Sequence, residues 1–199
     1  MFDKQIALQI KPIIDRLAKS LIGCGLRANF VTIVSFLIGF TSAALIAQGY
    51  FGLGCILFLF SRLGDALDGA MARQTATTAR GGFLDITLDF MVYASIPLAF
   101  AVVNPTSNAL AAATLLFFFI GTSASFLAYA AIAATVAPNR PTIKSIYFLG
   151  GLTEAFETLL FFCLMCLFPA HFATLAYVFS LLCGITIATR IYAGWHDFN

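Results

Sequence analysis

The sequence predicts an all-α integral membrane protein with six transmembrane helices and an N-terminal interfacial amphipathic helix. Three observations support this prediction: an excess of apolar residues, six long apolar stretches, and the placement of the basic residues. The chain of 199 residues is 61% hydrophobic and 10% charged, with a mean hydropathy of +0.96. A soluble domain is about 45–50% apolar and about 25% charged. Because a globule of 21.4 kDa lacks the interior to bury this excess, the composition excludes an ordinary soluble protein.

The first expected element is an amphipathic helix over residues 1–22, MFDKQIALQIKPIIDRLAKSLI. Its apolar side chains gather broadly on one side and its charged side chains mark the other. The apolar set is Ile6, Leu8, Ile10, Ile13, Ile14, Leu17 and Leu21, and the charged set is Lys4, Lys11, Asp15 and Lys19. We expect this helix to lie on the cytoplasmic leaflet, with Pro12 as a candidate kink. The alternative is a basic leader that only sets the topology. The regularly spaced charges are not typical of a secretory signal.

Six apolar stretches follow, each long enough to cross a bilayer, which takes about 20 mostly apolar residues. They run over residues 30–47, 51–73, 81–103, 108–136, 151–168 and 172–193. Each stretch is continuously apolar, whereas the strands of a membrane barrel alternate over roughly 10 residues. We therefore expect six helices. No repeat or change of composition divides the chain, so residues 1–199 are expected to form a single membrane domain.

The basic residues indicate how the six spans are oriented. The eleven Lys and Arg residues all fall before the first span, around the connections 74–80 and 137–150, or near the end of the last span. They are Lys4, Lys11, Arg16, Lys19, Arg27, Arg62, Arg73, Arg80, Arg140, Lys144 and Arg190. In a six-span layout these positions share one side, and the positive-inside rule makes that side cytoplasmic. Both termini are then expected in the cytoplasm.

One stretch concentrates carboxylates in a chain that otherwise avoids charge. DALDGAMARQTATTARGGFLDITLD, residues 65–89, holds four of the nine acidic residues. Asp65 and Asp68 are spaced i, i+3, and Asp85 and Asp89 are spaced i, i+4, so each pair shares a helical face. A short connection over residues 74–80 makes the two helices antiparallel neighbours. The two acidic faces are therefore expected to meet across a cleft that opens to the cytoplasm, where ionisable residues indicate a functional site.

Four carboxylates in a low-dielectric site repel one another, so a positive partner is required. Ligands that are all oxygen favour Mg²⁺, Mn²⁺ or Ca²⁺ over zinc, and Mg²⁺ held by carboxylates is typical of a phosphate substrate. Two such ions can clamp an in-line phosphoryl displacement. Arg73 suits a phosphate oxygen, and Gly69 and Gly81 allow close approach because they lack a Cβ.

Two alternatives use the same aspartates. The carboxylates can be structural and paired with arginines, but only three arginines are near for four carboxylates. A cation channel or transporter can also use intramembrane aspartates, although such residues more often lie near the midplane on broken helices.

The aspartate stretch resembles the signature of the CDP-alcohol phosphotransferase family, DxxDGxxAR followed by GxxxDxxxD. Both halves are complete here, in DALDGAMAR over residues 65–73 and GGFLDITLD over residues 81–89. The chain departs from the family in its spacer, which has seven residues between Arg73 and Gly81 where the family usually has eight. That difference leaves open whether Gly81 or Gly82 takes the role of the family glycine. The six-span layout and the cytoplasmic amphipathic helix also resemble the family.

The resemblance implies a reaction and a role for each matching residue. Family members transfer a phosphatidyl or similar group from a CDP-linked lipid to an alcohol and release CMP. By this resemblance Asp65, Asp68 and Asp85 hold a pair of Mg²⁺ or Mn²⁺ ions, and Asp89 completes the second site and is the general base. The CDP pocket is implied to comprise Asp65, Gly69, Ala72 and Arg73. The resemblance also implies CDP-diacylglycerol as a substrate and a homodimer in a bacterial inner membrane; nothing points to a nucleic-acid partner.

The sequence leaves the acceptor alcohol open. A phosphorylated acceptor needs cations near the cleft, and the candidates are Arg62, Arg80, Arg140 and Lys144. Glycerol 3-phosphate is our expected acceptor because it is a common bacterial use of the family, with inositol or its phosphate, serine and a lipid alcohol as alternatives. Glu154 and Glu157 form an i, i+3 pair in the fifth span, and either acceptor recognition or helix positioning would explain them.

Overall fold

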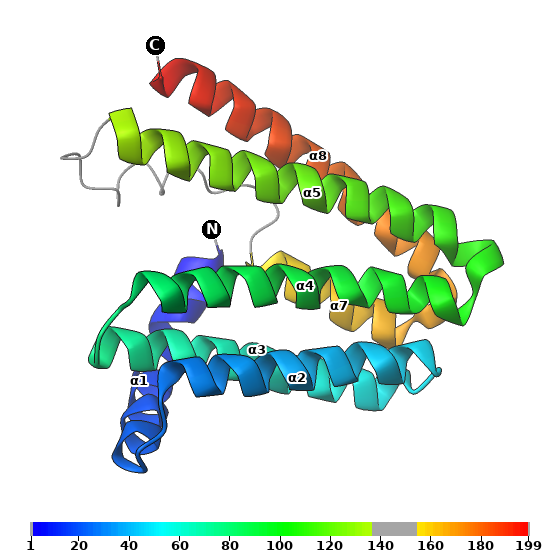
Figure 1. The fold of residues 1–199 in the computed structure, drawn as a ribbon. Helices are drawn as coiled ribbons and strands as arrows, with labels where there is room; N and C mark the ends of the chain where they lie inside the picture. Colours follow the sequence, from blue (N-terminus) through cyan, green and yellow to red (C-terminus); the bar gives the residue numbers. More distant parts are fainter. Residues whose placement is uncertain (1, 137–154, 199) are drawn as a thin grey trace.

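The structure is a computed structural model that describes residues 2–136 and 155–198, and the side chains of residues 10–135 and 155–198. Every long element in these ranges is an α-helix (Figure 1), which confirms the predicted all-α class. The elements are α1 (Phe2–Gly23), α2 (Ala28–Ala47), α3 (Phe51–Gln74), α4 (Ala79–Val103), α5 (Pro105–Val136), α7 (Ala155–Leu167), the short 3₁₀ helix η1 (Pro169–His171) and α8 (Phe172–Asp197).

Helices α5 and α8 run past the ends of the predicted spans, because the polar residues there continue or cap the helix. We expected the fourth span to begin at Asn108, but α5 begins at Pro105. Pro fits the first helical turn, and the Asn104 side chain accepts a hydrogen bond from the Ser107 backbone N–H at 3.3 Å. At the other end of the chain α8 continues to Asp197, beyond the predicted end at residue 193. An apolar stretch marks what lies in the lipid, whereas backbone hydrogen bonds continue the helix past it.

Four helices in the described ranges are long and apolar enough to cross a membrane: α2, α4, α5 and the η1–α8 segment. Helix α3 has 24 residues but carries Arg62, Asp65, Asp68 and Arg73, and these charges lower its hydropathy. Helix α7 has 13 residues within the described range; residues 151–154 of the predicted fifth span lie outside it. The chain is an integral membrane protein. Helix α7 is apolar but short within the described range, whereas α3, which carries the first two aspartates, is less apolar than α2, α4, α5 and α8.

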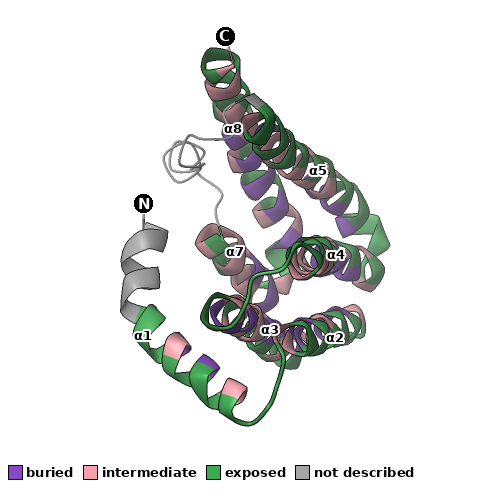
Figure 2. Ribbon diagram, turned by 60° about the vertical axis from the view of Figure 1, so that its left-hand side comes forward, coloured by how far each residue is buried: buried purple, intermediate pink, exposed green. Residues whose placement is uncertain are grey.

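The helices form two groups that share one core. Helix α2 packs on α3 and α4, and α5 packs on α8, with α4 joining the groups by packing on α5 (Figure 1). Buried aromatic rings fill the centre; they include Phe58, Phe100, Phe162, Phe172 and Phe179. Figure 2 shows that the buried residues face inward, while most outer helix surfaces are exposed. Exposed large apolar residues such as Leu110 and Phe117 suit contact with lipid.

Small residues bring α2, α3 and α4 close together beside the aspartates. The Ser61 hydroxyl on α3 donates to the Ser35 carbonyl on α2 at 2.8 Å. A Cβ placed on Gly39 of α2 would lie 2.7 Å from Ser61 Oγ and 2.8 Å from a methyl carbon of Val92 on α4. A Cβ on Gly64 would collide with Ser35. Glycine and serine therefore set the spacing of the three helices, as is common where helices pack in lipid.

Helix α1 crosses one end of the bundle (Figures 1 and 2). Its Ile14 and Ala18 are buried against Ala70 and Met71 of α3. Pro12 lies inside α1, which the structure describes as one helix. Helix α1, the C-terminal end of α8 and the connection between α3 and α4 lie at this same end of the bundle (Figure 1).

The close contact at Gly39 predicts that an alanine there lowers the stability of the protein, whereas an alanine at Gly52 does not. Gly39→Ala should destabilise the protein by about 1–3 kcal/mol, the usual cost of overpacking a well-filled interior. Gly52→Ala on α3 is the matched control, because a Cβ there meets nothing within 4 Å and alanine favours the helix. Thermal unfolding of the purified protein in detergent measures both. Equal unfolding temperatures for the two variants would contradict this account of the packing.

Candidate active site

The connection between α3 and α4 is shorter than the sequence predicted. We expected it to span Gln74 to Arg80, but the helices end and begin so that only residues 75–78 lie between them. The Thr78 side chain caps α4 by accepting a hydrogen bond from the Gly81 backbone N–H at 3.0 Å. This cap draws Ala79 and Arg80 into the first turn of α4. Helices α3 and α4 run antiparallel on either side of this connection and both pack on α2. Their acidic faces meet through side chains, as predicted.

The aspartates of the two helices meet at this end of the bundle. Asp65 and Asp68 of α3 and Asp85 of α4 each offer one carboxylate oxygen, and these oxygens lie within 4.8 Å of one another. Asp68 is 3% exposed, and its Oδ2 has no hydrogen-bond partner among the described residues. A buried oxygen without a partner is costly. Three carboxylates with an unused acceptor fit a hard divalent cation, which takes oxygen ligands.

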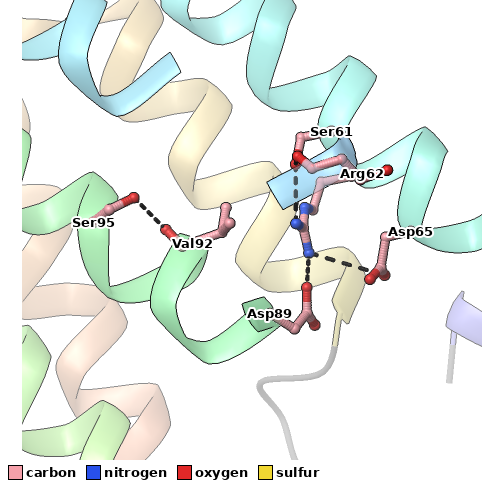
Figure 3. Close-up of polar contacts among 7 residues, drawn as sticks. Ser61, Arg62, Asp65, Asp89, Val92 and Ser95 are labelled. Atoms are coloured by element: carbon pink, nitrogen blue, oxygen red, sulfur yellow. Dashed lines mark hydrogen bonds and ion pairs between the residues drawn. The ribbon is translucent and has the colours of Figure 1, made fainter. Parts of the chain in front are cut away.

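The fourth aspartate is held apart from this group by an arginine. Arg62 Nη1 donates to Asp89 Oδ1 and lies 3.9 Å from Asp65 Oδ2 (Figure 3). Arg62 Nη2 also contacts Ser61 Oγ at 3.1 Å, and its guanidinium carbon lies 4.9 Å from the centre of the Tyr93 ring. Arg62 thus bridges α3 and α4 from inside. The sequence predicts Arg62 as a candidate acceptor cation, and the structure places its guanidinium against Asp89.

The glycines around the aspartates differ in how closely they are packed. A Cβ on Gly81 would lie 3.0 Å from both Asn29 Oδ1 and Thr78 Oγ1, whereas a Cβ on Gly82 would meet nothing within 4 Å. Gly81 is therefore the position where a side chain is hard to fit. Gly69 leaves room for the side chain of Arg73, whose Nη1 would lie 3.3 Å from a Cβ there.

A cavity of about 820 Å³ lies on the other side of Asp89, between α4, α5, α7 and α8. Its wall is mainly apolar, with polar groups from Asp89, Tyr93, Thr122, Ser123, Thr158 and Arg190. Asp65, Asp68 and Asp85 do not line it. A molecule in this cavity can therefore reach Asp89 while the three-carboxylate group faces elsewhere.

Arg190 is a site residue that the sequence analysis used only for topology. Its Nη1 donates to the Thr122 carbonyl at 2.9 Å, and its guanidinium carbon lies 5.6 Å from the centre of the Phe126 ring. The available signal was its position inside the predicted last span, where an ionisable residue indicates function.

The other predicted acceptor residues are not part of the described site. Arg80 is exposed in the first turn of α4. Arg140, Lys144 and Glu154 lie outside the described residues. Glu157 lies in the first turn of α7, next to Thr158 of the cavity wall.

Comparison with known proteins identifies a matching family and two relatives. The family model for CDP-alcohol phosphatidyltransferase matches residues 26–191. The chain is 45% identical over 197 residues to the inner membrane protein YnjF of Escherichia coli, covering 98% of this chain and 96% of that protein. It is 39% identical over 94 residues to an archaetidylinositol phosphate synthase of Pyrococcus horikoshii, covering 46% of this chain and 50% of that protein.

The fold is also similar to a solved structure. The Mycobacterium tuberculosis phosphatidylinositol phosphate synthase PgsA1 with CDP-DAG bound matches with a TM-score of 0.72 and 21% identity, covering 92% of this chain and 94% of that one. The same enzyme in complex with manganese and citrate gives a TM-score of 0.73. At this identity the likeness shows a shared fold.

The bridge between Arg62 and Asp89 can be tested by a double-mutant cycle on stability. Arg62→Gln should destabilise the protein because it leaves the carboxylates of Asp89 and Asp65 facing each other without a cation. Asp89→Asn in the same background should restore part of the loss, with a coupling free energy of about 0.5–3 kcal/mol. Thermal unfolding in detergent without divalent metal measures all four proteins. Additive effects would show that the pair does not stabilise the fold.

Proposed function

This chain belongs to the CDP-alcohol phosphatidyltransferase family, and from that membership we propose that it transfers a phosphatidyl group from CDP-diacylglycerol to an alcohol and releases CMP. The observation that carries the proposal is the group formed by Asp65, Asp68 and Asp85 at the facing ends of α3 and α4, with Asp89 one helical turn beyond. The complex of PgsA1 with CDP-DAG supports the choice of the CDP-linked substrate.

The three carboxylates would hold a divalent cation, with Asp89 completing a second site. The unpartnered Oδ2 of Asp68 supports this assignment, and the manganese complex of PgsA1 supports Mg²⁺ or Mn²⁺ as the ion. When bound, such ions neutralise charge on the phosphates of the substrate and on the leaving CMP. Asp65, Gly69, Ala72 and Arg73 would line the CDP pocket, where the planar guanidinium of Arg73 suits a phosphate oxygen.

Asp89 would accept the proton of the acceptor hydroxyl. The new bond forms between the acceptor oxygen and the phosphorus on the lipid side, the bond from that phosphorus to the CMP oxygen breaks, and CMP leaves. Because Arg62 contacts one oxygen of Asp89, it would orient this carboxylate and leave its second oxygen for the hydroxyl. Positioning of this kind supplies much of the rate enhancement in phosphoryl transfer.

The cavity beside Asp89 would receive the acceptor. Glycerol 3-phosphate is our first candidate; inositol phosphate, supported by the name of the Pyrococcus relative, is the second, followed by inositol, serine and a lipid alcohol. Arg190 is the described cation in the cavity wall, and Arg80, Arg140 and Lys144 are further candidates for a phosphorylated acceptor. An acceptor panel with purified protein, CDP-diacylglycerol and Mn²⁺, read by CMP release, decides among them.

The membrane layout would be six spans with both termini and the aspartates on the cytoplasmic side of a bacterial inner membrane. Helices α3 and α7 would add two spans to the four apolar ones, and α1 would lie at the cytoplasmic interface. The Escherichia coli inner membrane protein YnjF, which matches nearly the whole chain, supports the location. Residues 1–199 would form one domain, and the family resemblance supports a homodimer.

Replacing the proposed base should remove catalysis. Asp89→Asn is expected to lower the rate of CMP release by about 10²–10⁴-fold, the usual contribution of a general base. Asp197→Asn at the end of α8, outside the carboxylate group and the cavity beside Asp89, is the control for loss of one carboxylate. If the Asp89→Asn variant unfolds at the same temperature as the wild type and releases CMP at an undiminished rate, the assignment of Asp89 as the base is refuted. Metal flux into sealed vesicles without CMP release would support a cation transporter instead.

A matched pair of substitutions on α5 tests the acceptor cavity. Ala124 lines the cavity, whereas Ala128, one turn further, is exposed and does not line it. Ala124→Phe should raise the KM for the acceptor tenfold or more, because the larger side chain fills part of the cavity and the acceptor then has to overpack it. The affinity for CDP-diacylglycerol should stay unchanged. Ala128→Phe should behave like the wild type in steady-state kinetics. Equal KM values for the two variants would place the acceptor elsewhere.

A further inference from the structure

A second cavity, of about 590 Å³, lies between α1 and the end of α3 and is not explained by the proposed reaction. Six side chains line it: Lys11, Asp15, Arg16, Lys19, Arg73 and Gln74. Four of the six are cationic and one is a carboxylate. The concentration of positive charge is large for a chain in which only 10% of residues are charged.

Helical spacing puts the cations of α1 on one flank of that helix. Lys11, Asp15 and Lys19 follow one another at i, i+4, so they form one row, and Arg16 lies next to it. The neighbouring row contains Ile14 and Ala18, which are buried against α3. The cationic flank therefore lies beside the seam between α1 and α3, next to Arg73.

The opposite flank of α1 is apolar and exposed. Ile10, Ile13 and Leu17 are 46%, 59% and 44% exposed. An exposed apolar flank beside a cationic one is typical of a helix that lies in the membrane interface, with its apolar side chains among the acyl chains. The cationic flank is then at the depth of the lipid phosphates, where each Lys or Arg is attracted to anionic headgroups.

Helix α1 is held in place at this cavity. Gln74 at the end of α3 donates from Nε2 to the Asp15 backbone carbonyl at 3.0 Å, and the buried contacts of Ile14 and Ala18 fix the same turn. Within the described side chains, the ion pairs found are those of Arg62. None of the four cations of the cavity is thus within 4.0 Å of a carboxylate among these described side chains, and Asp15 is the one carboxylate in the described lining.

We propose that this cavity, the α1–α3 basic site, binds a lipid-borne phosphate. Two sources carry that chemistry: the headgroup of an anionic membrane phospholipid, and the diphosphate of the CDP-linked lipid. The second source rests on the proposed function, because Arg73 also belongs to the proposed CDP pocket; the first does not. A phosphate oxygen that contacts two or more of these cations compensates the charge that no described carboxylate neutralises.

The test uses the full-length protein in nanodiscs and measures binding, not turnover. The variant is K11Q/K19Q, both exposed positions whose loss should not unfold the helix. K11R/K19R keeps the charge, and R27Q removes a cytoplasmic-side cation at the start of α2, outside the cavity. In the first arm, native mass spectrometry measures retention of phosphatidylglycerol relative to phosphatidylcholine. In the second arm, titration with CDP-diacylglycerol in phosphatidylcholine nanodiscs measures its affinity.

We expect K11Q/K19Q to bind the lipid about 30-fold more weakly in one of the two arms, since each Lys near a lipid phosphate contributes roughly a factor of five to binding. K11R/K19R and R27Q should bind like the wild type in both arms. A loss of phosphatidylglycerol retention identifies a membrane lipid as the source, and a loss of CDP-diacylglycerol affinity identifies the substrate. Unchanged binding in both arms would overturn the proposal, as would an equal loss in R27Q, which would indicate diffuse surface charge. If the wild type releases no CMP but the first arm shows the loss, the proposed function fails and the basic site stands.

Discussion

The mutual repulsion of four carboxylates at the facing ends of α3 and α4 is the constraint on which the rest of this structure depends. Like charges in a medium of low dielectric constant separate unless cations or fixed contacts hold them. The protein meets this constraint in two ways. Arg62 bridges Asp89 and Asp65 from the interior, and Asp65 also converges with Asp68 and Asp85 so that a divalent cation fits among the three. Structural stability and metal binding are therefore two responses to the same charge.

The convergence requires helices that approach closely. Gly39, Gly64, Ser35 and Ser61 bring α2, α3 and α4 together without bulky side chains between them. Ser61 serves twice, because it donates to α2 and contacts the guanidinium of Arg62. The packing that forms the bundle is thus directly connected to the residue that positions the proposed base.

Asp89 divides the site into two sides with different physical character. Toward the C-terminal end of α3 lie the carboxylate group and the α1–α3 basic site, which includes Arg73. Toward α5 and α8 lies the mainly apolar cavity. A charged nucleotide diphosphate suits the first side, and an alcohol with apolar parts suits the second. A transferase needs both substrates to meet at one atom, and Asp89 is the side chain that borders both sides.

The sequence by itself determined the all-α membrane class, the two acidic faces and the family, because these depend on hydropathy and on residue spacing within single helices. It did not predict that Arg62 would contact Asp89, that Thr78 would shorten the connection, or that Lys11 and Arg73 would share a cavity. The sequence marked Arg190 as an ionisable residue inside the last span, but not that it would line the cavity beside Asp89. Such contacts join residues far apart in the chain, and they depend on the rotation and separation of packed helices. Those quantities are set by the summed contacts of small residues such as Gly39 and Ser61 between helices, and only the tertiary structure decides them.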